Sequence, residues 1–466
     1  MSRTHPRRRK AVAIWFLRRN NATLQLAPKC SAPVNLPHCT YEFWFSENDV
    51  KYSSAGVARS VAPRATIRRA NAVLDAIGVT KVADVTNLDR VGIPNFISVR
   101  PHDLGPGISY YNGKGRTRPD AHAGALMEAV ERHAAEEYGG PILSISYRNL
   151  RNRHPCIDPR EIPIPMVRDF EENLLLEWVS GFDLISRRET FVPLNCVLAP
   201  YVTYLANHLF YSGTNGLASG NSRSEALCHA LCEVIERDSM ALAAARAHIR
   251  PAIAVMLTDI GFDRGSLPEP KDAPLISLES LPKTATALVR KLQRAGLQVY
   301  LRNLTSKLGI ATIGCTIVDP HSSAAVSAHG GCGTHPDARI AVTRALTEAA
   351  QSRLGWIQGG REDLPDIAPP ATGSGRGSHG RGDTMEFRDI PSYEHASVKE
   401  DVELLINRMQ RGGFDQAVAV DLTRQGIGIP VVRVVVPKAE SWPIYCSPTG
   451  RSVLGHRVVQ AIHADD

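Results

Sequence analysis

Three common sequence signals are missing from this chain. No apolar run approaches the ~20 residues that a helix needs to span a bilayer, so we expect no membrane association and a cytoplasmic location. The nine cysteines are an odd number spread along the chain, which favours free thiols over a disulfide framework. The phosphate-binding pattern GxxxxGK followed by Ser or Thr does not occur. Any phosphate site must therefore be built in another way.

Net charge is also scarce outside the first twenty residues. The formal charge is +7, and residues 1–20 contain seven basic residues and no acid, which accounts for the whole excess. The rest is formally neutral, so we expect no nucleic-acid surface. Residues 1–50 are predicted to be a basic, disordered extension in which 41–45 could pair as a strand. Residues 51–466 are predicted to form the folded domain, with a low-complexity loop at 368–384 and a proline-rich connection at 246–283.

One motif occurs three times. The copies are ALMEAVER from Ala125, ALCEVIER from Ala230 and ALTEAAQSR from Ala345. Each reads Ala-Leu-x-Glu, followed three residues later by Glu, Glu and Gln respectively. Residues at i and i+3 share a helix face, so each copy predicts a helix with two polar side chains on one side. On the central helix, Glu225 lies a little over two turns earlier on the same side.

For a single helix, an acidic stripe that faces solvent explains these glutamates as well as a buried cluster does. The other side chains of the central helix are mostly apolar, however, and buried acids repel one another unless cations offset their charge. Because the motif recurs, several acid-bearing helices are available to converge. We therefore favour a site for a metal ion or a metal–nucleotide complex.

A second pattern runs beside the first. Residues 82–101, 300–320 and 418–437 each read as a strand, a turn before Gly-Ile, and an apolar strand that ends near proline. A helical run precedes each of them, at roughly 64–77, 283–295 and 398–411. We therefore expect an α+β fold of related helix/β-hairpin units packed together, with the acid-bearing helices converging on one site.

These motifs resemble the YcaO family, whose members are ATP-dependent enzymes that activate peptide backbone amides. The resemblance rests on GKG at 113–115, ALMEAVER, TNGLASGN with EALCHALCEVIERD, and GCGTHPDARIAVTRALTEAAQSR. It implies a YcaO-like catalytic domain that binds ATP and Mg2+. The nucleotide-binding residues that it implies are Lys114, Glu128, Glu131, Glu225, Glu233, Glu236, Arg237, Glu348, Gln351 and Arg353. Those implied to hold magnesium are Glu128, Glu131, Glu233, Glu236 and Glu348. No residue stands out as the general base.

The resemblance also implies a reaction. Residues 80–101 and 420–437 look like the branch of the family that works with a TfuA-type partner, which is associated with thioamide formation in ribosomal peptides or proteins. We therefore expect O-phosphorylation of a backbone amide in a peptide or protein substrate, with sulfur delivered by that partner, in a homodimer. One alternative is an azoline-forming cyclodehydratase. Another is a nucleotide-binding accessory protein, which Gly124 favours because the family usually has serine at this position.

Two groups of cysteine and histidine also have the spacing of metal ligands. The first is Cys228 and Cys232, one helical turn apart beside His229, and we favour core packing for it. The second is His329, Cys332 and His335 in HGGCGTH. Since this loop leads into the third copy of the motif, we expect a structural or substrate-facing role rather than a zinc site.

Overall fold

The computed structural model has a mixed α+β fold, which confirms the predicted class. It describes residues 40–45, 49–54, 57–101, 108–162, 168–201, 207–260, 267–269, 271–322, 327–359, 380, 382–441 and 455–463. The first 39 residues of the predicted extension lie outside this set. So does most of the low-complexity loop predicted at 368–384.

The folded part of the chain begins before Lys51. Residues Tyr41–Trp44 form a short helix, α2, so the strand predicted here is wrong. Tyr41 and Phe45 are one helical turn apart, and their rings contact each other with centroids 4.6 Å apart. Trp44 is 1% exposed and packs in the core with Phe182 and Leu184. Residues 40–45 of the predicted extension thus pack with the folded domain.

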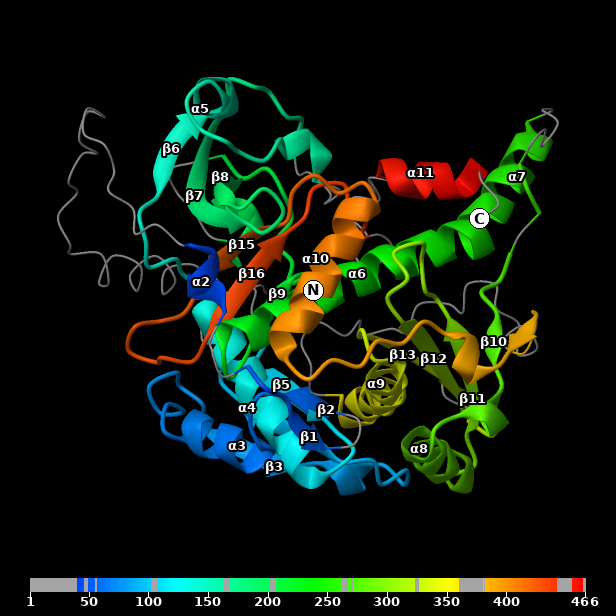
Figure 1. The fold of residues 1–466 in the computed structure, drawn as a ribbon. Helices are drawn as coiled ribbons and strands as arrows, with labels where there is room; N and C mark the ends of the chain where they lie inside the picture. The colour runs from blue at the N-terminus through cyan, green and yellow to red at the C-terminus, as the bar shows by residue number, and fades with distance from the viewer. Residues whose placement is uncertain are drawn as a thin grey trace, which may run out of the picture.

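Three units of the same construction form most of the molecule (Figure 1). Each has a helix, an antiparallel β-hairpin, a third strand antiparallel to the second strand of the hairpin, and an acid-bearing helix packed on this small sheet. Unit A contains α3 (Pro63–Asn71), β3 (Lys81–Asp84), β4 (Asn95–Val99), β5 (Tyr110–Lys114) and α4 (Arg118–Ala134). Unit B contains α8 (Lys283–Arg294), β11 (Gln298–Asn303), β12 (Thr312–Val318), β13 (Ala328–Thr334) and α9 (Ala338–Gln358).

Unit C is assembled from two distant parts of the chain. Its helix and hairpin are α10 (Val398–Arg411), β15 (Val418–Asp421) and β16 (Val431–Val435), and its third strand and acidic helix are β9 (Leu217–Ser219) and α6 (Arg223–Ala244). The strand order β15-β16-β9 matches β3-β4-β5 and β11-β12-β13. The central acidic helix therefore belongs with a hairpin that follows it by almost 200 residues.

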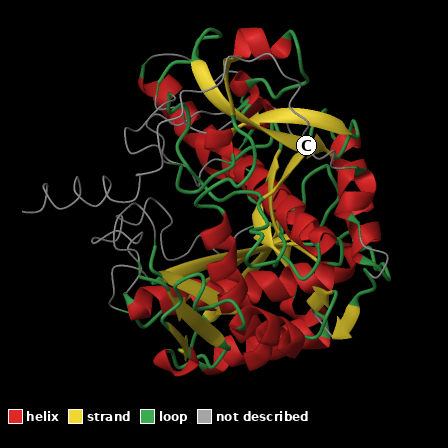
Figure 2. Ribbon diagram, turned by 90° about the vertical axis from the view of Figure 1, so that its left-hand side faces the viewer, coloured by secondary structure: helices red, strands yellow, loops and turns green. Residues whose placement is uncertain are grey.

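The remaining strands extend these sheets. In unit C, β7 (Leu175–Asp183) pairs with β15 through residues 182–183. It also pairs with β6 (Leu143–Ser146) through residues 175–178 and with β8 (Arg188–Pro193) through residues 178–183. In unit B, β10 (Leu275–Ile276) and β14 (Thr384–Met385) continue the sheet beyond β11. β1 (Tyr52–Ser54) and β2 (Val57–Arg59) form a separate two-stranded sheet. The helices α5 (Tyr147–Arg151) and α11 (His456–His463) belong to none of the three units. Figure 2 shows the strands in separate groups with helices packed between and around them.

Two glycines allow the third strands to lie directly on the acidic helices. A Cβ atom at Gly113 of β5 would lie 2.0 Å from the carbonyl oxygen of Ala121 in α4. A Cβ atom at Gly333 of β13 would lie 2.2 Å from the carbonyl oxygen of Ala341 in α9. Only glycine fits at such a close approach of two backbones. These glycines therefore have a packing role in two equivalent units.

The central helix is longer than the sequence predicts. α6 continues through a π-helical turn, Ala245–Ile249, into α7 (Arg250–Asp259), so the connection predicted at 246–283 is wrong over its first part (Figure 1). Pro251 follows the π-helical turn directly, at the point where the α-helical hydrogen-bond pattern is already interrupted. By length and composition alone, Arg223–Asp259 could cross a membrane, but helices of a protein core pass the same test. Most of α6 is buried, whereas 22% of the apolar window that passes the test is buried, and a single such helix is weak evidence for a membrane span.

Candidate nucleotide and metal site

The helices α4, α6 and α9 border one cavity of about 580 Å³. Its wall contains side chains from all three units and from the β2 strand. Nine of the ten residues predicted to bind nucleotide line it, namely Lys114, Glu128, Glu131, Glu225, Glu233, Glu236, Arg237, Glu348 and Gln351. The three acid-bearing helices therefore converge on one cavity, as the sequence predicts.

Each acidic helix begins at the cavity, directly after the third strand of its unit. Thr117 caps α4 in a capping box with Asp120, and Ser222 and Asp337 cap α6 and α9 through their side-chain oxygens. Such caps satisfy backbone N–H groups that a helix leaves free at its start, and so fix where it begins. In all three helices, the first glutamate of the repeated motif follows the cap by eleven residues. The three glutamates consequently lie at the same depth along their helices.

The first glutamate of each motif is paired with a cation. Glu348 forms an ion pair with Lys114 of β5, which crosses from unit A to unit B. Arg132 Nη2 lies 3.5 Å from Glu128 Oε1 in α4, and Arg237 Nη2 lies 3.4 Å from Glu233 Oε1 in α6. Burial alone would raise the pKa of Glu348, but the nearby positive charges of Lys114 and Arg237 hold it below its usual value.

The second glutamates are less well satisfied. Glu131 accepts a hydrogen bond from the backbone N–H of Ser219 at 2.9 Å, yet burial raises its pKa to about 8. Glu236 is 2% exposed, and its Oε2 atom has no hydrogen-bond partner among the described residues. Burial raises the pKa of Glu236 too, although Arg237 opposes the shift with Nη2 3.7 Å from Oε1.

This arrangement fits a divalent cation. Glu236 is buried and Glu131 is half-buried, and the neighbouring arginines, Arg237 and Arg132, only partly offset the cost of burying their charge. Mg2+ prefers carboxylate oxygens and commonly binds through a few of them together with phosphate oxygens. The orphaned oxygen of Glu236 is a ligand of that kind, and Glu131 lines the same cavity.

Glu225 also lines the cavity, but its carboxylate is already occupied. Its oxygens accept from the Ser60 backbone at 2.9 Å, the Ser60 hydroxyl at 2.7 Å and the Asn221 amide at 2.9 Å. Arg59 Nη1 lies 3.1 Å from Oε1. In this structure Glu225 therefore holds the end of the β2 strand against α6.

Arg353 is the one predicted residue that the structure does not bring to the cavity. Its Nε lies 3.1 Å from Asp89 Oδ2 and its Nη1 lies 3.3 Å from Asp319 Oδ2, and all three side chains are at most 10% exposed. Five residues separate it from Glu348, which turns it about 140° round the helix. Assigning Arg353 to the site from sequence is thus corrected to a buried ion pair between units A and B.

The structure also rules against the cysteine and histidine groups as metal centres. His329, Cys332 and His335 lie along β13 and just after it, and they have different neighbours: His329 lies near Arg353, Cys332 near Glu236 and His335 near Lys51. Cys228 and Cys232 hydrogen-bond to each other in the core, and this bond together with burial raises the pKa of the Cys228 thiol. Core packing, as the sequence analysis favours, accounts for both cysteines.

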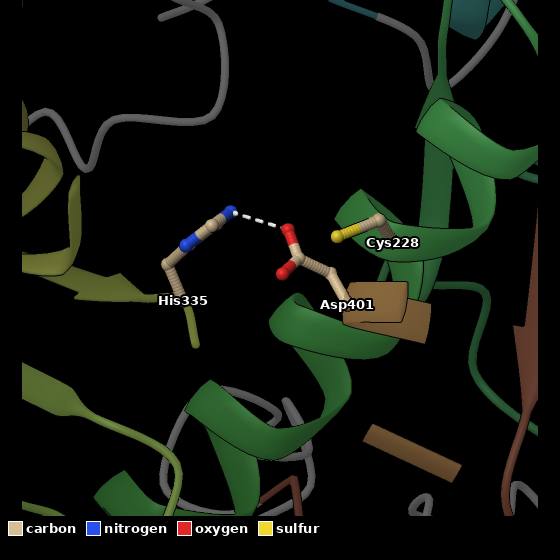
Figure 3. A group of neighbouring side chains, drawn as sticks. All are labelled: Cys228, His335 and Asp401. Carbon is tan, nitrogen blue, oxygen red and sulfur yellow. Dashed lines mark ion pairs between the residues drawn. The ribbon is translucent and has the colours of Figure 1, made fainter. Parts of the chain in front are cut away.

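A different trio does meet in space: the side chains of Cys228, His335 and Asp401 have ligand-type atoms within 4.8 Å of one another (Figure 3). His335 Nδ1 accepts a hydrogen bond from the Asp337 backbone at 2.9 Å, so in the neutral ring Nε2 carries the proton and points to Asp401 at 3.7 Å. Lys51 Nζ already lies 2.6 Å from Asp401. Asp401 is therefore already paired with Lys51, and the trio is a buried polar contact rather than a metal site.

Sequence reasoning missed several cations of the cavity wall. Arg132 follows Glu131 just as Arg237 follows Glu236, so the internal repeat contains the signal that would have identified it. Arg344 and His229 precede the third and second copies of the motif, at the position that Gly124 occupies before the first copy. All three of these residues line the cavity. No sequence signal identified Arg59 and Arg116, which also line it.

The fold and the site together define a class of protein that holds a metal–nucleotide complex with carboxylates on converging helices, in a chain without a P-loop. Residues 112–440 match the family described as YcaO cyclodehydratase, ATP- and Mg2+-binding. The chain belongs to the YcaO family, which confirms the resemblance seen in its motifs. Members of this family bind ATP and Mg2+, as we expected of the cofactors.

Relatives and a solved structure agree with this assignment. The chain is 34% identical over 412 residues to an uncharacterized protein of Methanothermobacter thermautotrophicus, covering 85% of this chain and 98% of the relative. It is 30% identical over 415 residues to an uncharacterized protein in the tfuA 3′ region of Rhizobium leguminosarum, covering 84% and 92%. The structure of YcaO from Methanopyrus kandleri bound with AMPPCP and Mg2+ is similar with a TM-score of 0.66 at 27% identity, covering 88% of this chain and 99% of that one.

Proposed function

We propose that this protein uses ATP to O-phosphorylate a backbone amide of a ribosomal peptide or protein, and that its product is a thioamide. The observation that carries the choice of product is the relative in the tfuA 3′ region, which is similar over almost its whole length. In this proposal, a TfuA-type partner delivers sulfur to the activated amide. The protein acts in the cytoplasm as a homodimer.

The cavity has the groups that such a reaction needs. An amide oxygen is a poor nucleophile, so the triphosphate must be held in line with it and its charge must be neutralised. In our proposal, Glu128, Glu131, Glu233, Glu236 and Glu348 hold magnesium, and Gln351 and Glu225 contact the nucleotide. Bound magnesium would supply positive charge at the phosphate oxygens.

Cationic side chains supply the rest of the positive charge. Lys114, Arg132 and Arg237 reach the cavity from β5, α4 and α6, and each is paired with a glutamate there. We propose that they contact phosphate oxygens, where positive charge stabilises the transition state of phosphoryl transfer. No general base is assigned among the residues of the wall.

Azoline formation is the second candidate, since the family is described by its cyclodehydratase activity. There, a cysteine, serine or threonine of the substrate attacks the amide, and the phosphorylated oxygen then leaves as phosphate. Thioamide formation likewise needs transfer of phosphate to the amide oxygen and loss of that oxygen as phosphate, but an external sulfur nucleophile attacks. The two candidates therefore differ in the nucleophile and not in the use of this cavity.

One reconstitution separates these possibilities. The purified protein would be incubated with ATP, Mg2+, sulfide, a TfuA-type protein and a candidate peptide whose amide is labelled with heavy oxygen. Mass spectrometry should find sulfur in place of one oxygen, and the label in the released phosphate. Loss of water in place of sulfur gain would establish azoline formation. Stimulation of another modifying enzyme without labelled phosphate would favour an accessory role and contradict the proposal.

A further inference from the structure

The acidic helices each contribute an arginine to the cavity, and one of the three is held differently. Arg132 of α4 and Arg237 of α6 pair with glutamates of their own helices. Arg344 of α9 has Glu348 four residues later, a spacing at which arginine and glutamate commonly pair. Within the described residues, however, Glu348 pairs with Lys114, and Arg344 forms no ion pair.

The partner of Arg344 is a histidine. Arg344 Nη2 lies 3.1 Å from His229 Nε2, across the contact between α9 and α6. A guanidinium only donates hydrogen bonds, so His229 must accept through an unprotonated Nε2. Burial and then the charge of Arg344 itself hold the pKa of His229 well below its usual value, which is consistent with a neutral ring.

A neutral acceptor orients a guanidinium without cancelling its charge. A glutamate in the same place would fix Arg344 equally well but would neutralise it, as Glu128 does for Arg132. The charge of Arg344 is felt by Glu236 and Glu348, whose pKa values it lowers. Neither carboxylate is bonded to it, so its remaining N–H groups are left for another acceptor in the cavity.

We propose that His229 is a positioning residue that holds Arg344 as an uncommitted cation for a phosphate group of the nucleotide. To bind phosphate, three cations must first break their ion pairs with glutamates: Lys114, Arg132 and Arg237. A metal ion coordinated by those glutamates would make these ion pairs easier to break. Arg344 needs no such step. It accordingly contributes to the affinity for nucleotide even when no metal is present.

The test is equilibrium binding of a non-hydrolysable ATP analogue and of inorganic triphosphate in EDTA, where no turnover occurs. R344Q should bind both probes about 10- to 100-fold more weakly than wild type, since hydrogen bonds to charged groups are worth this much. H229Q keeps an acceptor oxygen and should remain within about threefold of wild type. H229E should lose as much affinity as R344Q because it neutralises Arg344.

Two controls separate this role from general effects of charge and packing. S352D adds one negative charge to the same cavity at a residue that has no proposed contact with the nucleotide or with Arg344, and it should cost less metal-free affinity than H229E. H229L should weaken binding in the wild-type background and have no further effect in R344Q, since His229 acts through Arg344. Thermal melting would verify that each variant is folded.

Either of two results would overturn the proposal: R344Q binding triphosphate in EDTA as wild type does, or H229E matching H229Q. A purely structural His229 would give equal losses for H229Q and H229E and an added loss for H229L in R344Q. None of these measurements uses a peptide, a partner or sulfide. Their outcome is therefore independent of whether the product is a thioamide.

Discussion

Two of the clusters of buried charge among the described residues differ in how well their charges are satisfied. In the cluster around Arg353, the guanidinium contacts Asp89 and Asp319, and Arg90 adds a second contact to Asp319 at 2.8 Å. In the cavity, Glu236 has an oxygen without a described partner, and burial raises the pKa of Glu131 to about 8. The first cluster joins units A and B, whereas the second is incomplete without a ligand.

The comparison shows that burial of charge does not by itself mark a functional site. Both clusters contain acids and arginines contributed by α9 or its neighbours, and sequence position along α9 suggested that Arg353 belonged with Glu348. What distinguishes the cavity is unsatisfied charge next to open volume. Substitutions should therefore separate the two clusters into one that supports stability and one that supports binding.

The largest effect is expected for E236Q. Replacing an unsatisfied carboxylate by an amide of the same shape removes a magnesium ligand, so Mg2+-dependent binding of ATP should weaken about 100-fold. Without metal, stability should change by less than about 1 kcal/mol, because the amide removes a buried charge whose Oε2 has no described hydrogen-bond partner but also weakens the contact with Arg237. Titration calorimetry and thermal melting would measure the two effects.

The matched control for E236Q is E225Q, which alters a carboxylate that Ser60, Arg59 and Asn221 already occupy. It should lose less magnesium-dependent affinity and more stability than E236Q. If E225Q lost more magnesium-dependent affinity and less stability than E236Q, the number of hydrogen-bond partners of a carboxylate would not distinguish metal ligands from structural acids in this cavity.

A smaller effect, and one on stability, is expected for R353M. Removing one partner of a buried ion pair leaves Asp89 uncompensated, which costs about 3–5 kcal/mol. Chemical denaturation would measure this loss, and adding Asp89→Asn should recover part of it. Nucleotide affinity of the folded variant should remain within about threefold of wild type. If affinity fell instead while stability held, Arg353 would belong to the binding site after all.

The smallest effect is expected for G124S, which restores the residue that is usual in the family. The new Cβ would lie 3.3 Å from the Gly113 Cα, a tight contact, but serine also favours a helix over glycine by about 0.5 kcal/mol. Stability should therefore change by less than about 1 kcal/mol, and ATP turnover by less than about tenfold. G124A, which has the Cβ without the hydroxyl, is the control. A much larger gain specific to G124S would mean that Gly124 impairs catalysis.

Much of the site was predictable because its signal is local. The i, i+3 spacing of the motif places Glu128 and Glu131, and likewise Glu233 and Glu236, on one helix face. The family resemblance then implied the role of these faces, and the structure brings them to one cavity. Arg353 was placed wrongly for a local reason as well, since a motif match does not show which way a side chain points.

Pairing across the cavity was not predictable. Glu348 forms its ion pair with Lys114 and not with Arg344, although Arg344 is only four residues away in the sequence. Arg344 instead hydrogen-bonds to His229 on another helix. These partners are more than 100 residues apart in the chain, so no local pattern relates them. The internal repeat could have identified Arg132, but not its state of pairing.

The sequence by itself determined the repeated acidic helices, the hairpins that accompany them and the family to which the chain belongs. These follow from helical periodicity, strand alternation and motif spacing, which act over a few residues. Only the tertiary structure decided that β9 and α6 complete the unit of a hairpin far along the chain, and which buried charges found partners. The reason is that compensation of a buried charge depends on distances between side chains from separate elements, and folding alone sets those distances.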